Sequence, residues 1–206
     1  MTKKIITLIA ALFATAVFAN DNAILTKIKN ANTQIKSIES AFKETKVLKV
    51  NGKKVEKNGT FYFVAPSKLA MHYSEPAGDK TVINGNEMLV SAKGKKRTFN
   101  TEKNARMHSL ATILLCAIHG EIEQLCEAVS ATSSATEKGD SYVVTVNATK
   151  KSSKGYSKIE ITYAKADGLI RQMVMTENSG DATTYILTGA TKNKTIADSQ
   201  FSTAKK

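Results

Sequence analysis

Alternating apolar and polar residues predict consecutive antiparallel strands in the first half of the chain. Between Pro66 and Pro76, one side of a predicted strand is uniformly apolar because it carries Leu69, Met71 and Tyr73. The residues that predict the next hairpin are Val82 and Ile83, an Asn84-Gly85 turn, Met88 and Val90. An apolar sheet face of this kind needs something to cover it.

Further strands are predicted on both sides of this segment. Two precede it, at Ser40 to Val50 and Lys54 to Val64, joined by an Asn51-Gly52 turn, and the strand-rich pattern continues to Thr98. Four more are predicted in the second half, with turns at Asp167-Gly168 and Ser179-Gly180: Tyr142 to Val146, Lys158 to Tyr163, Leu169 to Thr176 and Thr183 to Leu187. Many short strands with regular turn signals indicate a barrel or a curved sheet.

Two other stretches have the apolar spacing of helices. Residues 20–38 predict an N-terminal helix, with one apolar stripe formed by Ile24, Ile28, Ala31, Ile35 and Ile38. Residues 101–129 predict a helical insertion that Gly120 interrupts, with apolar residues at Met107, Leu110, Ala111, Leu114, Leu115, Ile118, Ile122, Leu125 and Val129. An insertion of this length between strands can lie across the mouth of an open barrel.

The first 19 residues have the pattern of a secretory signal peptide. Lys3 and Lys4 form a basic start, an apolar core runs from Ile5 to Phe18, and Ala19 ends a small-residue cleavage site. The apolar core is shorter than the roughly 18 residues that a membrane anchor needs. We therefore expect export to the periplasm and a soluble product, because no cysteine for lipidation lies near the cleavage site. Cleavage of 19 residues from 206 leaves 187, which we expect to form one domain, 20–206.

The chain is strongly basic, with a formal net charge of +12 that falls to +10 without Lys3 and Lys4. Nucleic acid is the usual partner of such a charge, but an exported protein rarely meets it. The basic residues gather at predicted turns, most densely around Gly94 at Lys93, Lys95, Lys96 and Arg97. Two interpretations stay open: solvated hairpin ends that discourage edge-to-edge aggregation, or a docking patch for an acidic partner or an anionic membrane.

Residues for catalysis are scarce. None of the three histidines lies in a hydrolase, zinc-protease or deaminase pattern, and no paired carboxylates are evident. We therefore expect a protein that is not an enzyme and needs no cofactor. Cys116, His119 and Cys126 are close in sequence, but positions 116 and 126 of a continuous helix would stand about 15 Å apart. With a sharp turn at Gly120 the two cysteines are candidates for a disulfide; free thiols and a metal site are the alternatives, and we assign no metal site.

The order of strands, prolines and turns resembles that of the LolA-type outer-membrane lipoprotein carriers of Gram-negative bacteria. The resemblance begins at Gly59, passes through the strands around Pro66 and Pro76, and ends in the segments Ser179 to Ile186 and Ile196 to Phe201. It thus covers nearly the whole mature chain. Carriers of this kind form an incomplete antiparallel β-barrel lidded by helices. The resemblance therefore implies a mainly β (α+β) fold with one curved antiparallel sheet, whose concave cavity the helices cover.

The resemblance also implies a function: shielding the acyl chains of lipoproteins or related lipids on their way to the outer membrane. The partners would be an inner-membrane donor transporter and an outer-membrane acceptor, with the carrier a monomer. The expected cavity residues are Leu69, Met71, Tyr73, Met88, Val90, Leu110, Leu114, Met173 and Met175. The alternative is a structural or signalling module whose barrel is packed shut by the same side chains.

The chain departs from this family at one position that matters for the lid. Carriers of this type commonly have an arginine immediately before the first proline, where it holds the lid by hydrogen bonds. Here Ala65 occupies that position. We therefore expect other polar groups to hold the lid, or a different cargo.

Overall fold

The alternating segments form one antiparallel sheet in the computed structural model, which describes residues 21–150 and 155–204. The predicted signal peptide, 1–19, lies outside the described residues. A helix over residues 21–33 comes first. The strands are β1 (Ser37–Val47), β2 (Lys54–Val64), β3 (Lys68–Glu75), β4 (Lys80–Asn84), β5 (Glu87–Ala92), β6 (Lys95–Asn100), β7 (Ala131–Lys138), β8 (Ser141–Ala148), β9 (Tyr156–Ala164), β10 (Ile170–Glu177) and β11 (Ala182–Lys192). The other helical elements are η1 (Thr101–Lys103), α2 (Ala105–His119), α3 (Ile122–Val129) and η2 (Asp198–Phe201).

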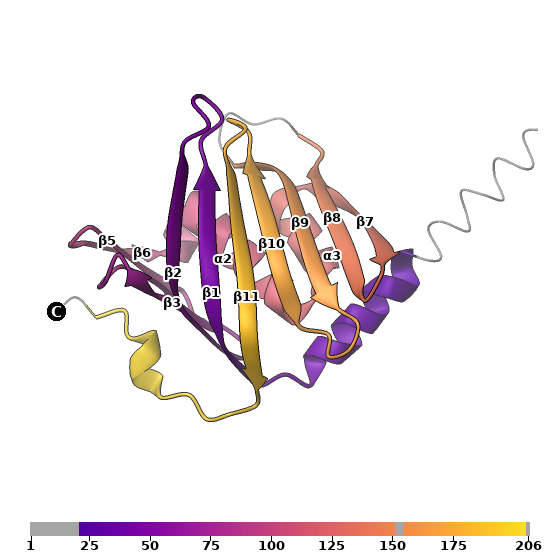
Figure 1. Cartoon of the computed structure of the whole chain (residues 1–206), viewed down its shortest axis with the longest axis horizontal. Coiled ribbons are helices and arrows are strands. Elements are labelled where there is room, and N and C mark those ends of the chain that lie inside the picture. Colours follow the sequence, from indigo (N-terminus) through magenta and orange to yellow (C-terminus); the bar gives the residue numbers. More distant parts are fainter. Residues whose placement is uncertain (1–20, 151–154, 205–206) are drawn as a thin grey trace, which may run out of the picture.

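The strands follow one another in two meanders that meet in the middle of the sheet. The order is β6-β5-β4-β3-β2-β1-β11-β10-β9-β8-β7, and the pairing of β1 with β11 joins the two halves (Figure 1). Strands β6 and β7 are the edges, so the sheet is not closed. The predicted fold class, a single unclosed antiparallel sheet with helices, is confirmed.

The helical insertion connects the two edge strands and lies against one face of the sheet (Figure 1). We call this the inner face and refer to α2 and α3 together as the lid helices. Gly120 separates them as predicted, because it adopts a left-handed conformation with φ of 70° and ends α2. The inner face, the lid helices and the N-terminal helix enclose one apolar cluster, which is the main core of the protein.

The N-terminal helix is shorter than predicted, because it ends at residue 33 and not at 38. The last two isoleucines of its stripe, Ile35 and Ile38, are still buried, but they lead into β1, which begins at Ser37. Ile38 pairs with Phe63 on one side and Lys192 on the other. Strand pairing on both sides therefore overrides the helical spacing, and β1 also starts and ends three residues before the predicted strand.

Strand β7 was not predicted from the sequence. Its residues are mostly alanine, serine, threonine and charged residues, and only Ala135 is buried, so the segment has little apolar alternation. It forms because it pairs along its whole length with β8, from Ala131 opposite Ala148 to Lys138 opposite Ser141. A strand of this kind depends on its neighbour and not on its own side chains.

The C-terminal segment covers part of the outer face of the sheet. Phe201 is fully buried against Ala70, Val82 and Leu89, in a second apolar cluster. His72 lies beside this cluster, with its Nε2 atom 2.9 Å from the carbonyl oxygen of Gln200. Strand β3 is therefore covered on both faces near its middle, although the alternation alone predicts only one apolar side.

Gly59 on β2 has no room for a side chain between β1 and β3. A Cβ atom there would lie 2.0 Å from the backbone oxygen of His72 and 2.8 Å from the ring of Phe42. We expect Gly59→Ala to destabilise the fold by about 1 to 3 kcal/mol, because backbone cannot move away as a flexible side chain could. Urea unfolding checks this, with exposed Asn58→Ala as the control, expected within about 0.5 kcal/mol of the wild type. Equal stability of the two variants would contradict the close packing at Gly59.

Candidate functional site

The nine residues predicted to line a cavity lie together. They come from β3, β5, β10 and α2 and belong to the single cluster between the inner face and the lid helices. Six are at most 5% exposed: Leu69, Met71, Met88, Leu114, Met173 and Met175. The other three, Tyr73, Val90 and Leu110, are partly buried at its margin. The structure thus brings the predicted set together, with the lid helices packed directly on it.

One buried hydrogen bond fixes the last turn of α2 to the sheet. The hydroxyl of Tyr163 on β9 donates to the carbonyl oxygen of Ala117 at 2.6 Å, and the tyrosine side chain is fully buried. Burial raises the pKa of this hydroxyl far above its usual range, so it remains a donor. The bond satisfies a polar group that would otherwise be unpaired inside the apolar cluster.

A second contact holds the end of α2 beside the position where related carriers have an arginine. The Nε2 atom of His119 lies 2.9 Å from the carbonyl oxygen of Pro66, and its ring meets that of Phe63 edge to face at 5.0 Å between centroids. Because a carbonyl only accepts, Nε2 carries the proton in this bond. The polar group that ties lid to sheet thus comes from the lid helix, next to Ala65. Sequence reasoning missed it, although a histidine in the last turn of a predicted lid helix was the available signal.

The two cysteines flank the turn between the lid helices and are free thiols in the structure, so the candidate disulfide is not formed. Cys116 is buried, and burial raises the pKa of its thiol to about 12. Cys126 is half-buried, and its thiol pKa is also raised, mainly by burial. The sharp turn depends on Gly120, where a Cβ atom would lie 2.8 Å from the side chain of Ile28. The N-terminal helix therefore packs directly on this turn.

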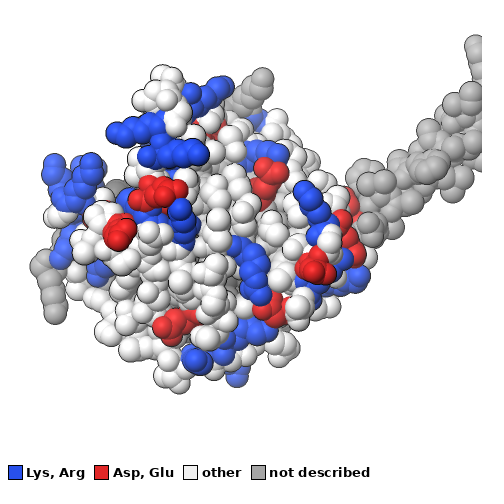
Figure 2. All heavy atoms as spheres, viewed as in Figure 1, with Lys and Arg blue, Asp and Glu red and all other residues white. Residues whose placement is uncertain are grey.

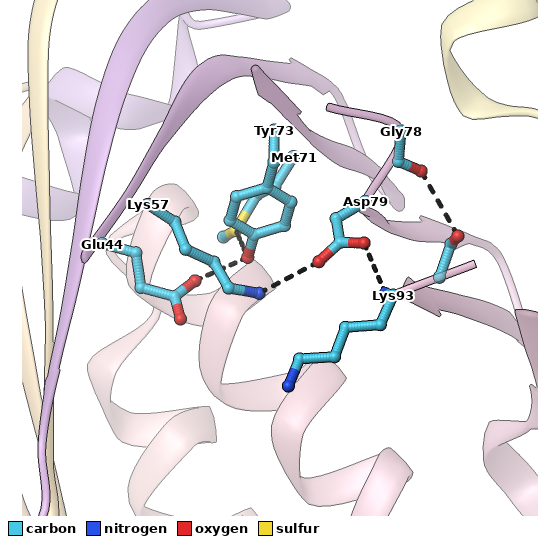
Figure 3. A network of polar contacts seen from close by, with 8 residues as sticks. Glu44, Lys57, Met71, Tyr73, Gly78, Asp79 and Lys93 are labelled. Carbon is cyan, nitrogen blue, oxygen red and sulfur yellow. Dashed lines mark hydrogen bonds and ion pairs between the residues drawn. The ribbon is translucent and has the colours of Figure 1, made fainter. Parts of the chain in front are cut away.

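A network of polar side chains crosses one end of the inner face (Figure 3). The hydroxyl of Tyr73 donates to Glu44 at 2.5 Å, and the ammonium group of Lys57 lies 4.6 Å from the centre of the same ring. Lys57 also pairs with the buried carboxylate of Asp79 at 3.4 Å, and Asp79 accepts the backbone N–H of Lys93 at 2.7 Å. The network links β1, β2 and β3 to the β5–β6 hairpin.

Polar side chains also line this end of the inner face on β10 and β11, and we call the whole row the polar rim. Tyr185 lies directly opposite Glu44 in the β1–β11 pairing, and Tyr156 lies opposite Glu177 in the β9–β10 pairing. Glu177 forms an ion pair with Lys46 at 2.7 Å. The pKa values of both tyrosines are raised, first by burial and then by the neighbouring carboxylates. The inner face is thus apolar in its middle and polar along this end.

A pocket of about 390 Å³ opens beside this rim, between the start of α2, the end of α3 and the adjoining ends of β8 and β9. The apolar residues in its wall are Ala105, Ile113, Ala128, Val129 and Ala148. Ile113 and Val129 also belong to the main apolar cluster, so the pocket borders the core under the lid helices. A larger hollow of about 900 Å³ lies between the N-terminal helix and α3, but its lining is mostly polar and suits no apolar ligand.

The four predicted docking residues do not share one face. Lys93 lies in the turn of the β5–β6 hairpin, and Lys95, Lys96 and Arg97 are the first residues of edge strand β6, so successive side chains point to opposite faces. All four are exposed. Figure 2 shows basic side chains gathered toward the side of the molecule where the β1–β2 and β5–β6 hairpins lie. Basic residues on an edge strand also fit the interpretation that they discourage aggregation.

Comparison with known proteins agrees with the fold. The family described as "Outer membrane lipoprotein carrier protein LolA" matches residues 33–204. The chain belongs to the LolA family. No curated protein matches it. The part of the chain that the structure describes contains no helix long and apolar enough to span a membrane.

Solved structures with a similar fold are distant in sequence. An uncharacterized conserved protein from Thermus thermophilus is 10% identical, with a TM-score of 0.50 over 87% of this chain and 91% of that one. A LolA superfamily protein from Nitrosomonas europaea is also 10% identical, with a TM-score of 0.45 over 88% and 97%. MucB, from the MucA/MucB complex of Pseudomonas aeruginosa, is 12% identical, with a TM-score of 0.48 over 89% of this chain and 60% of MucB. At these identities the likeness concerns the fold alone.

Thiol labelling tests the state of the cysteines. Because the thiolate is the reactive form, we expect maleimide at neutral pH to label the native protein slowly, and Cys116 more slowly than Cys126. After unfolding without a reductant, both should react. The single variants Cys116→Ser and Cys126→Ser assign each label. Fewer than two labels on unfolded, unreduced wild-type protein would instead indicate a disulfide.

Proposed function

We propose that the protein is a periplasmic carrier that shields the acyl chains of lipoproteins or related lipids and delivers them toward the outer membrane. One observation carries this proposal. The apolar inner face of an unclosed sheet is covered by a two-helix insertion and the N-terminal helix, and a pocket borders the interface between sheet and insertion at one end. Membership of the LolA family supports it, as does the export signal expected at residues 1–19.

The lid helices can be exchanged for an acyl chain at modest cost. Moving one methylene group from water to an apolar surface contributes about 0.8 kcal/mol, so an acyl chain of ordinary length can offset the apolar contacts that a helix gives up. Met71, Met88, Met173 and Met175 lie on the inner face, and the flexible methionine side chain fits irregular partners. The side-chain hydrogen bonds that join α2 to the sheet in the described part of the chain come from Tyr163 and His119, and each is worth about 1 kcal/mol net.

A second candidate function is a non-catalytic structural or signalling module. The close burial of the nine inner-face residues under the lid helices favours it, because a permanently packed core needs no ligand. The two functions differ in whether lipid accompanies the protein. Native mass spectrometry of protein purified from the periplasm separates them, since only the carrier retains lipid.

Substitution at the margin of the inner face tests the carrier function. We expect Leu110→Glu to abolish lipid retention, because an ionised carboxylate among acyl chains costs several kcal/mol. The half-buried position on α2 should let the variant fold, which circular dichroism verifies. Val50→Glu is the matched control, because Val50 is 89% exposed on the β1–β2 turn. Equal lipid content in both variants would argue for the packed module.

The basic hairpin gives a separate test of delivery. Replacing Lys93, Lys95, Lys96 and Arg97 by glutamine should leave lipid retention intact but slow transfer to anionic acceptor vesicles at low salt. The difference should vanish as salt rises, because exposed charges are screened over about 8 Å at physiological ionic strength. Transfer at the wild-type rate in low salt would leave only the protective role of an edge strand for these residues.

A further inference from the structure

The pocket at the end of the lid helices combines an apolar wall with an unpaired basic rim. Arg106 on α2 and Lys150 after β8 both line it, and neither has an ion-pair partner among residues 21–150 and 155–204. Many other lysines of the described chain do pair with carboxylates, Lys46 and Lys165 among them. Two unpaired cations beside apolar residues favour an anion attached to an apolar body.

The acidic side of the pocket does not cancel this charge. Glu177 is the carboxylate in the lining, and Lys46 already pairs with it at 2.7 Å. The remaining polar lining is neutral: Ser109, Ser130, Tyr156 and Asn178. The hydroxyl of Tyr156 has no hydrogen-bond partner within the described part of the chain. Counting Lys46, the rim therefore has three cations against one carboxylate, with neutral groups that can donate to an anion.

The volume of the pocket and the contact of its wall with the apolar cluster indicate what the anion is attached to. A volume of about 390 Å³ lies near the lower end of the roughly 300 to 1,000 Å³ found for small-molecule sites, which suits one narrow ligand. Ile113 and Val129 connect the wall to the apolar cluster beneath α2 and α3. A linear chain that enters here can continue under the lid helices by replacing their apolar contacts with the sheet, whereas a compact polar anion would leave the apolar wall unused.

We propose that this pocket is the entry site for a single acyl chain with a negatively charged head group, which Arg106 and Lys150 bind at the rim. The proposal rests on the carrier function and adds a preference for anionic over uncharged amphiphiles. A carboxylate or a phosphate satisfies the same chemistry. The head group stays at the rim near Tyr156, and the chain follows Ile113 into the interface between sheet and lid.

Binding of matched probes tests the head-group preference. We expect the wild-type protein to bind palmitate about tenfold more tightly than 1-hexadecanol, as two partly exposed ionic contacts would give. Arg106→Gln/Lys150→Gln should reduce this ratio to about one by weakening palmitate alone. Lys36→Gln/Lys194→Gln removes the same charge at the opposite end of the sheet, where β1 begins and β11 ends, and should keep the ratio. Lysophosphatidylglycerol, compared with palmitate, shows whether phosphate or carboxylate is preferred.

A third variant tests the route of the chain. Ala128 is an exposed residue of the pocket wall on α3, so Ala128→Trp should fill the pocket without disturbing the core. Both palmitate and 1-hexadecanol should then bind more weakly. Equal binding of the two probes by wild-type protein, or an unchanged ratio in Arg106→Gln/Lys150→Gln, overturns the proposal.

The outcome at Leu110 separates this proposal from the carrier function. If the pocket variants bind like the wild type while Leu110→Glu releases lipid, the entry site is wrong and the carrier function stands. If wild-type protein binds neither probe and purifies without lipid, the entry site and the carrier function are both wrong.

Discussion

Water has to be kept off the inner face of the sheet, because large apolar side chains point there from β3, β5 and β10 while the sheet does not close on itself. In a closed barrel the opposite strands would cover one another. Here the cover comes from the lid helices, inserted between the two edge strands. The need to bury this face explains why α2 has many buried apolar residues, why the chain turns sharply at Gly120, and why the N-terminal helix packs across that turn.

The covering helices are held mainly by apolar contact, which has no fixed direction, and by few directional bonds. Both bonds hold the last turn of α2: Tyr163 on β9 binds the carbonyl oxygen of Ala117, and His119 binds that of Pro66. Apolar contact can be exchanged for contact with a ligand, whereas an extensive buried polar network could not be exchanged cheaply. The packed arrangement therefore remains compatible with a carrier that opens.

Polar groups are concentrated at one end of the inner face and divide it into two zones. On β1, β2 and the β3–β4 turn, Lys57 pairs with Asp79 and Glu44 accepts the hydroxyl of Tyr73 (Figure 3). On the other side, near α2 and β9, Arg106 and Lys150 lack such partners in the described structure. Charged side chains that have partners favour a role in structural support. Charged side chains that lack partners beside a pocket favour a role in binding. The asymmetry is not visible from composition, because both zones contain the same residue types.

Local pattern determined much of the fold and of the candidate site. Alternation at Leu69, Met71 and Tyr73 placed β3 and its apolar side, and helical spacing with Gly120 placed the two lid helices, because both periods follow directly from backbone geometry. Long-range pairing decided the rest. Strand β7 exists because β8 pairs with it, and residues 34–38 leave the helix because β1 pairs with β2 and β11. The bond from His119 to Pro66 and the meeting of Arg106, Lys150 and Glu177 at one pocket join residues far apart in the chain, and no local periodicity encodes which distant residues will meet.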